Sequence, residues 1–409
     1  MDYNSEFCNA CSNGHLEVAK QLVESYPQIN ISADDNYAFI CAYLNGHLEV
    51  AKWLVESYPQ INRNISVGNN YTFQIACTNG QLELAKWLVE LYPQINVFAN
   101  NDSAFRYACE YGRLEVAKWL VESYPQINIS AQDNYAFVYA CSNGHLEVAK
   151  WLVESKPQIN ISADNDYAFR FACSEGHLEV AKWLVESYPL INISACNDYA
   201  FRSICSNGHL EVAKWLVESY PQIDISAQDN EAFWCACRYG HLEVVKWLVD
   251  SYPQINVSAD DDLAFRYACS NGHLEVARWL VDSYSQINVS AYVNEAFGYT
   301  CANGHLEVAK WLVDSYSQIN VSDCDDYAFR CACLNGHLEV AKWLVEIRPY
   351  CYVLELYPSQ TRILNWKIRP IQEIRWLERA VPILAYNSKT PNVFQMLNYD
   401  TMRYICKFV

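Results

Sequence analysis

One eleven-residue segment, GHLEVAKWLVE or a near copy of it, recurs along almost the whole chain. Its glycine returns every 32 residues, with a single step of 34 between Gly46 and Gly80. The glycines are Gly14, Gly46, Gly80, Gly112, Gly144, Gly176, Gly208, Gly240, Gly272, Gly304 and Gly336. A fixed period of this length is typical of stacked supersecondary units, none of which can bury its apolar face alone. We therefore predict a repeat array, although 409 residues would otherwise indicate two or three globular domains.

The first half of each repeat predicts a helix, here called helix A. In the second repeat it runs to about Leu44 and ends before Gly46, because glycine readily takes the left-handed conformation after a helix. An Asn or Asp ten residues before the glycine is predicted to cap its start, since a side-chain oxygen there can accept from free backbone amides. These residues are Asn36, Asn70, Asp102, Asn134, Asp166, Asp198, Asn230, Asp262, Asn294 and Asp326.

The second half predicts helix B, which spans residues 48–56 in the second repeat. Leu48, Ala51, Leu54 and Val55 share one face at helical spacing and are expected to be buried. Pro59 is expected to end the helix, because the residue before a proline is pushed out of the α region. A short finger-like turn then leads to the next repeat.

One tryptophan recurs at a fixed position of helix B and is expected to form a stacked core. The row is Trp53, Trp87, Trp119, Trp151, Trp183, Trp215, Trp247, Trp279, Trp311 and Trp343. The first repeat has Gln21 there and begins directly at helix A. Both features are typical of a terminal repeat whose outer side meets water.

The chain contains 18 cysteines, and ten of them lie three residues before the repeat glycine. One cysteine per repeat at one position indicates a small buried residue rather than a disulfide or metal framework. The Cys8–Cys11 pair has the spacing of a zinc half-site, but no second half-site of matching spacing follows. Reduced thiols indicate a reducing compartment.

The chain is acidic, with a formal net charge of −18. Nucleic-acid-binding domains usually carry a basic stripe, so DNA or RNA binding is not predicted. The first residues lack the pattern of a signal peptide, and no apolar stretch approaches the ~20 residues that span a bilayer. We expect an intracellular, cytoplasmic protein that is not embedded in a membrane.

The repeat resembles the ankyrin repeat. The family's A-A-x-x-G-H step is similar to residues 140–145, its V-V-x-L-L-L helix to residues 148–153, and its V-N link to Ile159 and Asn160. The resemblance covers about residues 4–346 and implies an all-α solenoid of about eleven helix-turn-helix units with short fingers. The small drift between copies most resembles ankyrin proteins of large DNA viruses of amoebae, which would place the protein in the host-cell cytoplasm.

The chain departs from the family pattern at the start of helix A. The family's T-P-L-H opening is replaced by Tyr-Ala-Phe-x, as at residues 167–170, and the glycine of the usual finger turn is absent. The threonine–histidine bonds that tie neighbouring ankyrin repeats are therefore not expected. The Asn or Asp cap and the tyrosine are candidates to replace them.

The resemblance implies a non-enzymatic scaffold that binds a partner protein through its fingers and the concave helix-A face. Helix B barely changes between repeats, whereas the position six before the glycine and the two positions just before it vary. Aromatic and arginine side chains are the usual anchors of interfaces. The candidate partner-binding residues are Arg106, Tyr111, Arg170, Glu175, Arg202, Trp234, Arg238, Tyr239 and Arg266. Neutral drift of solvated positions is the alternative interpretation.

Acidic finger tips such as residues 260–262 would steer a basic partner. Catalysis is not predicted, because all nine histidines occupy the same repeated position, whereas a catalytic site occurs once. No phosphate loop or metalloprotease motif appears, and no cofactor or metal is expected.

Residues 1–30 are expected to form an N-terminal capping repeat, residues 31–346 ten further repeats, and residues 347–409 a helical C-terminal cap or docking segment. Residues 347–409 carry nine basic and four acidic side chains. Residues 396–408 faintly resemble the helical boxes with which ankyrin adaptors recruit ubiquitin ligases, although Asn398 stands where those boxes have proline. The alternative function is therefore a substrate adaptor that binds a ubiquitin-ligase subunit.

Overall fold

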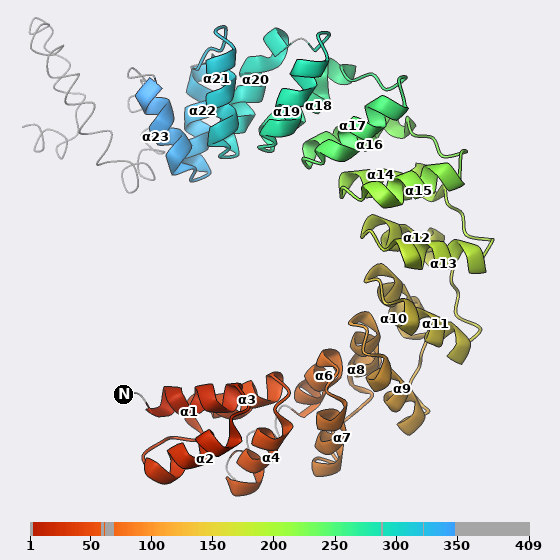
Figure 1. Ribbon diagram of the computed structural model, residues 1–409, viewed down its shortest axis with the longest axis vertical. Coiled ribbons are helices and arrows are strands. Elements are labelled where there is room, and N and C mark those ends of the chain that lie inside the picture. The colour runs from red at the N-terminus through yellow and green to blue at the C-terminus, as the bar shows by residue number, and fades with distance from the viewer. Residues whose placement is uncertain (1–2, 59–60, 62–68, 288, 322, 348–409) are drawn as a thin grey trace, which may run out of the picture. The chain divides into compact units, whose positions relative to one another are not determined.

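The computed structural model describes residues 3–58, 61, 69–287, 289–321 and 323–347. The described part contains 22 helices arranged as eleven antiparallel pairs, and no strand (Figure 1). The predicted all-α fold of helix-turn-helix units is therefore confirmed. The expected helices of the C-terminal segment lie outside the described residues.

The chain divides into two compact units, residues 1–200 and 201–409. The helices of unit 1 are α1 (Tyr3–Ser12), α2 (Leu16–Ser25), α3 (Ala33–Leu44), α4 (Leu48–Ser57), α6 (Asn69–Asn79), α7 (Leu82–Leu91), α8 (Ala99–Glu110), α9 (Leu114–Ser123), α10 (Ala131–Ser142), α11 (Leu146–Ser155), α12 (Ala163–Ser174) and α13 (Leu178–Ser187). The boundary falls within α14 (Ala195–Ser206). The helices of unit 2 are α15 (Leu210–Ser219), α16 (Ala227–Arg238), α17 (Leu242–Ser251), α18 (Ala259–Ser270), α19 (Leu274–Ser283), α20 (Val289–Ala302), α21 (Leu306–Ser315), α22 (Asp323–Leu334) and α23 (Leu338–Ile347).

Within each unit the first helix of every pair, helix A, packs mainly against helix A of the neighbouring repeats. Small residues allow this close approach: in α12, Ala168, Ala172 and Cys173 are each at most 1% exposed. Phe169 fills the remaining space and is equally buried. Alanine, phenylalanine and cysteine of helix A, together with the apolar stripe of helix B, therefore form a continuous core through each unit.

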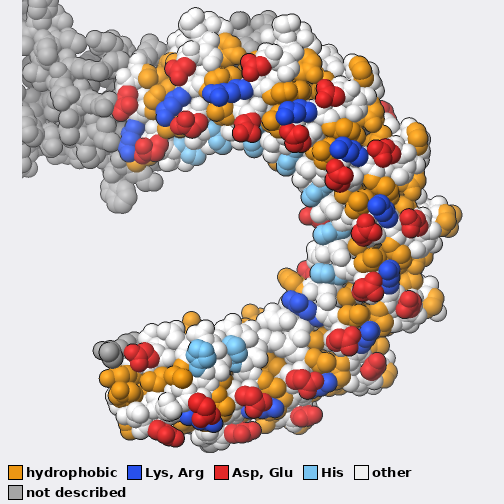
Figure 2. Space-filling view, viewed as in Figure 1, with side chains coloured by type: hydrophobic (Ala, Val, Ile, Leu, Met, Phe, Trp, Pro, Cys, Tyr) orange, Lys and Arg blue, Asp and Glu red, His pale blue; other side chains and the backbone are white. Residues whose placement is uncertain are grey.

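Helix B buries a slightly different stripe from the one predicted. Val50, Ala51 and Leu54 are at most 1% exposed, whereas Leu48 is only half-buried because it stands at the first residue of α4. On the outer side, lysine and glutamate pair at a spacing of three residues, as in the 3.2 Å contact between Lys150 Nζ and Glu147 Oε1. Such exposed pairs contribute little to stability. They appear in Figure 2 as blue and red side chains in alternation along each unit.

The tryptophan row lies at the rim of the core, so the prediction of a buried tryptophan stack was wrong. The described tryptophans of helix B are half-buried, while the phenylalanine of helix A is the fully buried ring. Trp151, for example, packs edge-on against Phe105 of the preceding repeat, with ring centroids 6.4 Å apart. Many of these tryptophans also contact the tyrosine that follows helix B, as Trp183 contacts Tyr188 at 5.8 Å. The indole therefore joins neighbouring repeats and keeps one edge near water, where its N–H can be solvated.

The Asn or Asp before helix A does not act as the predicted N-cap. The element begins three residues earlier, as α8 does at Ala99, and its first turn is left-handed: Asn100, Asn101 and Asp102 have φ values of 54°, 56° and 58°. Asp102 instead accepts a hydrogen bond from the backbone N–H of Asn128 in the next repeat, at 3.1 Å. Asn and Asp tolerate left-handed backbone better than other side chains, which explains the recurrence of these two residue types.

The same inter-repeat bond occurs in both units and replaces the threonine–histidine ties of the family pattern. Asp166 accepts from the backbone of Asn192 at 3.0 Å, and Asn294 accepts from that of Asn320 at 2.8 Å. Asn4 makes the equivalent contact in the first repeat, at 2.9 Å to Asn30. The expectation that this position helps to tie neighbouring repeats is therefore confirmed.

The end of helix B does not depend on proline. Helices α19 and α21 end at Ser283 and Ser315, although serine replaces the proline that follows most other copies. In each case the next tyrosine keeps its backbone bond to the last turn, as Tyr284 N–H does to the carbonyl of Leu280. The packing of the following link against the repeat therefore suffices to stop the helix.

The first repeat has a more exposed second helix than the other repeats. Val18 is 47% exposed, whereas its counterpart Val50 is 1% exposed, because no described residue covers the outer side of α2. The assignments of residues 1–30 and 347–409 as capping segments stay predictions.

Candidate functional site

One side of helix A is left free by the packing of the repeats. In α12 the buried side carries Phe169 and Cys173, while Tyr167, Arg170 and Phe171 are half-buried on the other side. Glu175, just after the helix, is exposed. We call the side chains nine, six, five, two and one residues before each glycine the helix-A face, since this spacing places them on one side of a helix.

Hydrogen bonds tie this face together at the end of each helix A. Asn143 Nδ2 donates to the carbonyl of Glu110 in the preceding repeat at 2.9 Å, and His145 donates to the same backbone group. Where histidine is replaced, its substitute keeps the bond: Gln81 donates to the carbonyl of Leu44 and Arg113 to that of Thr78, each at 3.0 Å. The histidine is therefore a structural donor in several repeats, as at His145, His241, His273 and His305.

The histidine also explains why the repeat glycine cannot change. Gly144 has φ of 78°, and a Cβ atom placed on it would lie 2.5 Å from Nδ1 of His177. Burial lowers the pKa of His145, and the pKa values of His241, His273 and His305 are lowered by the same cause. Burial in the folded chain therefore favours the neutral form of these imidazoles.

The candidate residues of unit 1 divide into buried and exposed side chains. Arg106 is only 6% exposed, and its guanidinium donates to the carbonyls of Asn100 and Asn101 at 2.9 Å. It therefore holds the left-handed turn and does not reach the surface, which its sequence position did not reveal. Arg170 makes the same pair of bonds but is half-buried, and Tyr111 is 48% exposed.

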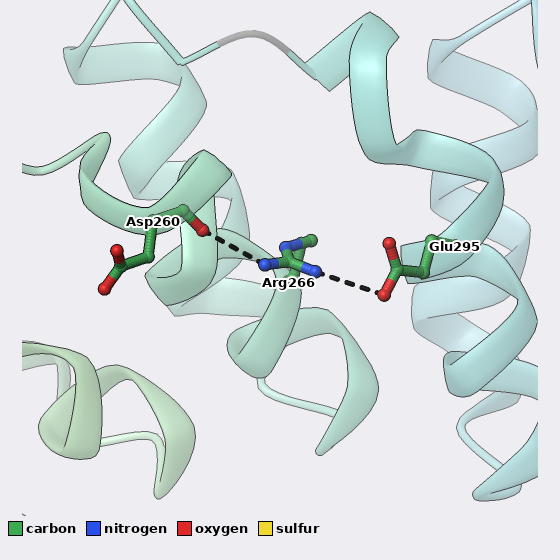
Figure 3. Close-up of polar contacts among 3 residues, drawn as sticks. All are labelled: Asp260, Arg266 and Glu295. Atoms are coloured by element: carbon green, nitrogen blue, oxygen red, sulfur yellow. Dashed lines mark hydrogen bonds and ion pairs between the residues drawn. The ribbon is translucent and has the colours of Figure 1, made fainter.

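The candidate residues of unit 2 form contacts between neighbouring repeats. Arg202 pairs with Glu231, and Arg266 pairs with Glu295 at 3.1 Å. Arg266 also donates to the backbone carbonyl of Asp260 at 3.0 Å (Figure 3). Both arginines are therefore half-buried and committed to contacts within the unit.

The remaining candidates of unit 2 form an aromatic cluster. Trp234 lies 5.7 Å from the ring of Tyr267, and the guanidinium of Arg238 lies 5.1 Å from the centre of that same ring. Tyr239 is 49% exposed at the edge of this cluster. The structure therefore brings Trp234, Arg238 and Tyr239 together around Tyr267, which the sequence analysis did not select.

Three candidates occupy the position that carries the tying asparagine in most other repeats. Asn45, Asn143, Asn303 and Asn335 each donate from there to the preceding repeat. The fourth, sixth and eighth repeats carry Tyr111, Glu175 and Tyr239 instead, and all three side chains are exposed. The asparagines at this position are also exposed, so each substitution removes the amide donor of an inter-repeat hydrogen bond and places a larger side chain on the same surface.

The aromatic residues of the helix-A face in unit 1 were missed as a group. Tyr135 stacks on Tyr139 with ring centroids 4.1 Å apart, and Tyr167 stacks on Phe171 at 4.0 Å. Tyr199 lies 6.5 Å from Phe171. Their positions nine and five before the glycine, a spacing of four residues, were the signal that could have identified them.

A further exposed apolar group lies on the same face in the second and third repeats. Tyr37 is 51% exposed, Ile40 and Leu44 are each 39% exposed, and Tyr71 is 68% exposed. Helices α3 and α6 carry no charged side chain at these positions. The helix-A face of unit 1 is therefore more apolar at its start than the candidate residues indicated.

The cysteines form no disulfide among the described residues. Burial raises the pKa of the Cys11 thiol to about 12 and raises that of Cys141 and Cys173 still further. The described residues also contain no group of three or more His, Cys, Asp or Glu side chains placed to bind a metal ion. Cys11 is fully buried, and Cys8 beside it is half-buried.

These features, stacked helix pairs tied by repeated donors, define a helical repeat protein with a variable face. Two models of ankyrin repeats match the sequence, one at residues 5–65 and 200–291 and the other across residues 45–185 and at 299–345. Together the matches cover more than three quarters of the chain. The chain belongs to the ankyrin-repeat family.

Two solved ankyrin-repeat structures are among those similar to this chain. The human ASB11 ankyrin repeat domain is 16% identical, with a TM-score of 0.35, over 49% of this chain and 96% of that one. An ankyrin repeat family protein from Legionella pneumophila is 19% identical, with a TM-score of 0.30, over 71% of this chain and 92% of that one. A comparison with curated proteins gave no significant match.

Ankyrin repeats are generally scaffolds for protein–protein interaction and are typically non-enzymatic. Within the described part of the chain, no helix has both the length and the apolar character that crossing a membrane requires.

Proposed function

We propose that this chain is a non-enzymatic scaffold that binds a partner protein through the helix-A face, with one stretch in each unit. In unit 1 the contacting side chains are Tyr111, Arg170 and Glu175, while Arg106 supports the turn beside them. In unit 2 they are Arg202, Trp234, Arg238, Tyr239 and Arg266. Half-buried arginines and aromatic rings held by neighbouring repeats lose little side-chain freedom on binding, which favours them as interface anchors.

The loss of the tying asparagine at Tyr111, Glu175 and Tyr239 carries this proposal. The tying asparagines are themselves exposed, but an intramolecular hydrogen bond stabilises a fold by about 0.5–1.5 kcal/mol, so its absence has a cost in stability. Neutral drift at this solvated position would be expected to leave small polar side chains. Two of the three replacements are instead tyrosines about half exposed, and tyrosine is enriched at interfaces.

The test restores the asparagine. We expect Tyr111→Asn with Tyr239→Asn to raise the melting temperature, because each new side chain can donate to the preceding repeat. We expect the same variant to bind the partner at least about tenfold more weakly, since two aromatic anchors are lost. Quantitative mass spectrometry of proteins retained by the wild-type and variant chains measures the difference.

Leu190→Gln is the matched control, because Leu190 is 92% exposed in a link between repeats, away from the helix-A face. It also restores the residue found in the other links. Equal retention of the same proteins by wild type and by the restored-asparagine variant would refute the proposed surface. A loss shared by the control would point to non-specific adhesion.

We propose further that the partner carries a basic surface, since residues 1–346 have a net charge of −23 and exposed Asp260 and Asp261 extend from a finger. Like-charged partners would be repelled, and a basic one would be steered toward the chain. The fifteen cysteines whose side chains the structure describes form no disulfide, which supports a reducing, intracellular compartment. A host-cell cytoplasm follows only if the viral resemblance holds.

The adaptor alternative depends on residues 396–408, which lie outside the described residues. Deleting residues 347–409 tests it: an adaptor would lose ubiquitin-ligase subunits from its retained proteins, and a plain scaffold would keep the same set. Partners bound by the helix-A face should stay with the truncated chain in either case.

A further inference from the structure

The aromatic rings of unit 1 form two rows, each of three rings from successive repeats. Tyr107, Tyr139 and Phe171 occupy the position five before the glycine, and Tyr135, Tyr167 and Tyr199 occupy the position nine before it. The rings are half-buried and stack on one another within and between repeats. Two arginines complete the rows: Arg106 lies 4.7 Å from the centre of Tyr135, and Arg170 lies 5.1 Å from that of Tyr199. The fifth and sixth repeats carry a ring of both rows, whereas the fourth carries only Tyr107 and the seventh only Tyr199.

The spacing of these rows selects the conformation of a bound segment. Packed helices lie about 8–10 Å apart, so each row presents a ring at roughly that interval. A polyproline II helix has three residues per turn and advances about 9 Å per turn, so the same side of it meets every ring. An α-helix repeats at about 5.4 Å and a β-strand at about 6.6 Å, and neither matches the rows.

The backbone chemistry of the surface favours the same conformation. The described residues contain no strand, and the exposed side of a helix has few unpaired backbone groups with which to extend a sheet. A polyproline II segment makes no internal hydrogen bonds, and its backbone stays solvated. Such a segment therefore needs apolar surfaces for its proline rings rather than partners for its backbone. Protein domains that bind polyproline II segments do so in aromatic-lined grooves.

Charge indicates the other property of the bound segment. Asp102 and Asp166 are buried, but Glu110, Asp164 and Glu175 are half-buried or exposed, and the only basic residues of helices α8, α10 and α12 are Arg106 and Arg170. Both arginines already donate hydrogen bonds to turn carbonyls. Glu175 is exposed, and Glu110 is half-buried and accepts a hydrogen bond of 2.6 Å from the hydroxyl of Tyr135. The surface is thus complementary to a positively charged segment.

We propose that the helix-A face of α8, α10 and α12 binds a basic, proline-rich segment of the partner in the polyproline II conformation. This proposal rests on the proposed function and names the chemistry of its partner. About nine residues of the segment cover the three repeats.

A display library of random peptides of about twelve residues, selected on the full chain, tests the proposal. We expect the enriched peptides to carry proline at every third position and Lys or Arg between the prolines. The best peptide should bind more weakly as salt is raised, because the charges involved are exposed. Its Kd should rise at least about tenfold for Tyr139→Ile with Phe171→Ser, since both aromatic platforms are lost.

The design separates loss of binding from loss of folding. Ile75 and Ser203 already occupy the same position in other repeats, so both substitutions fit this fold, and the selection on the wild-type chain is decisive by itself. Tyr299→Ile is the matched control at the same position in unit 2, and it should leave the Kd unchanged. Enriched peptides with helical periodicity, enriched peptides without proline, or the absence of enrichment would each overturn the proposal. If the restored-asparagine variant still releases a captured partner in that case, the proposed function stands and only the polyproline assignment fails.

Discussion

At the scale of single residues, the Asn or Asp before helix A shows how one side chain can serve two purposes. Its backbone is left-handed in seven of the described repeats, with φ of 69° at Asn36 and 58° at Asp262. Its side chain is buried, at 2% and 5% exposed in the same two residues. Left-handed backbone costs an ordinary L-residue roughly 1–2 kcal/mol, and only glycine, asparagine and aspartate adopt it readily. Among these, only asparagine and aspartate also supply the acceptor for the next repeat.

Substitutions at Asp102 separate these two contributions. We expect Asp102→Asn to change stability little, because Asn fills this position in other repeats. Asp102→Gly should lose only the bond to Asn128, worth about 0.5–1.5 kcal/mol. Asp102→Ala should lose the bond and also strain the backbone, for a total of about 2–3 kcal/mol. Thermal unfolding followed by circular dichroism ranks the three.

The order Asn, Gly, Ala is the informative result. If Gly and Ala destabilise the chain equally, the left-handed backbone is not a constraint at this position. If Gly matches Asn, the inter-repeat bond contributes nothing measurable.

At the scale of the element, the end of helix A depends on donors from the next repeat. The carbonyl of Glu110 accepts from both Asn143 and His145, and such C-terminal carbonyls have no partner within their own helix. The histidine can donate this hydrogen bond in its neutral or its protonated form. Burial favours the neutral form. Stability should therefore depend on pH through this row of histidines.

The direction follows from the lowered pKa values of His145, His241, His273 and His305. Unfolded histidine titrates near pH 6.5, so below that pH the unfolded chain binds more protons than the folded one. The contribution of the neutral imidazoles is complete above about pH 6.5 and is lost as the pH falls through the lower folded-state pKa values. We expect the melting temperature to fall between about pH 7.5 and pH 5.5.

Replacing these four histidines by glutamine gives the control, because Gln81 makes the same bond and does not titrate in this range. The variant should show a flatter profile over the same interval. An unchanged slope would assign the pH dependence to other groups.

At the scale of the whole molecule, each unit is held by one pattern repeated along its length. The cysteine of helix A is fully buried in most described repeats, as at Cys141 and Cys173, and burial raises the pKa of both thiols. Cys196, in the first turn of α14, is exposed, and it is alone in this among the cysteines whose side chains the structure describes. Thiol reactivity therefore reports whether the repeats are stacked.

In the native chain we expect iodoacetamide to modify Cys196 at least about tenfold faster than Cys141 or Cys173, because the reagent requires an accessible thiolate. Mass spectrometry of peptides distinguishes the sites. Denaturant should make the three rates similar. Comparable rates in the native chain would mean that the repeats open readily or are not packed as described.

Much of this protein follows from its sequence. The period of the glycine determined the repeat architecture, because stacked units must bury the same face each time, and it placed the ends of helix A and helix B to within a few residues. The variable positions identified part of the helix-A face, although the position just before the glycine also carries the tying asparagine in most repeats.

Tertiary structure decided the rest. The neighbouring repeat decides that Phe169, and not the tryptophan of helix B, is the fully buried ring. It also decides that Asp102 acts as an acceptor. Arg106 and Tyr111 are both variable, but only contacts across repeats bury one and expose the other. A linear sequence specifies which residues share a helix, whereas burial and hydrogen bonding depend on atoms contributed by the next repeat.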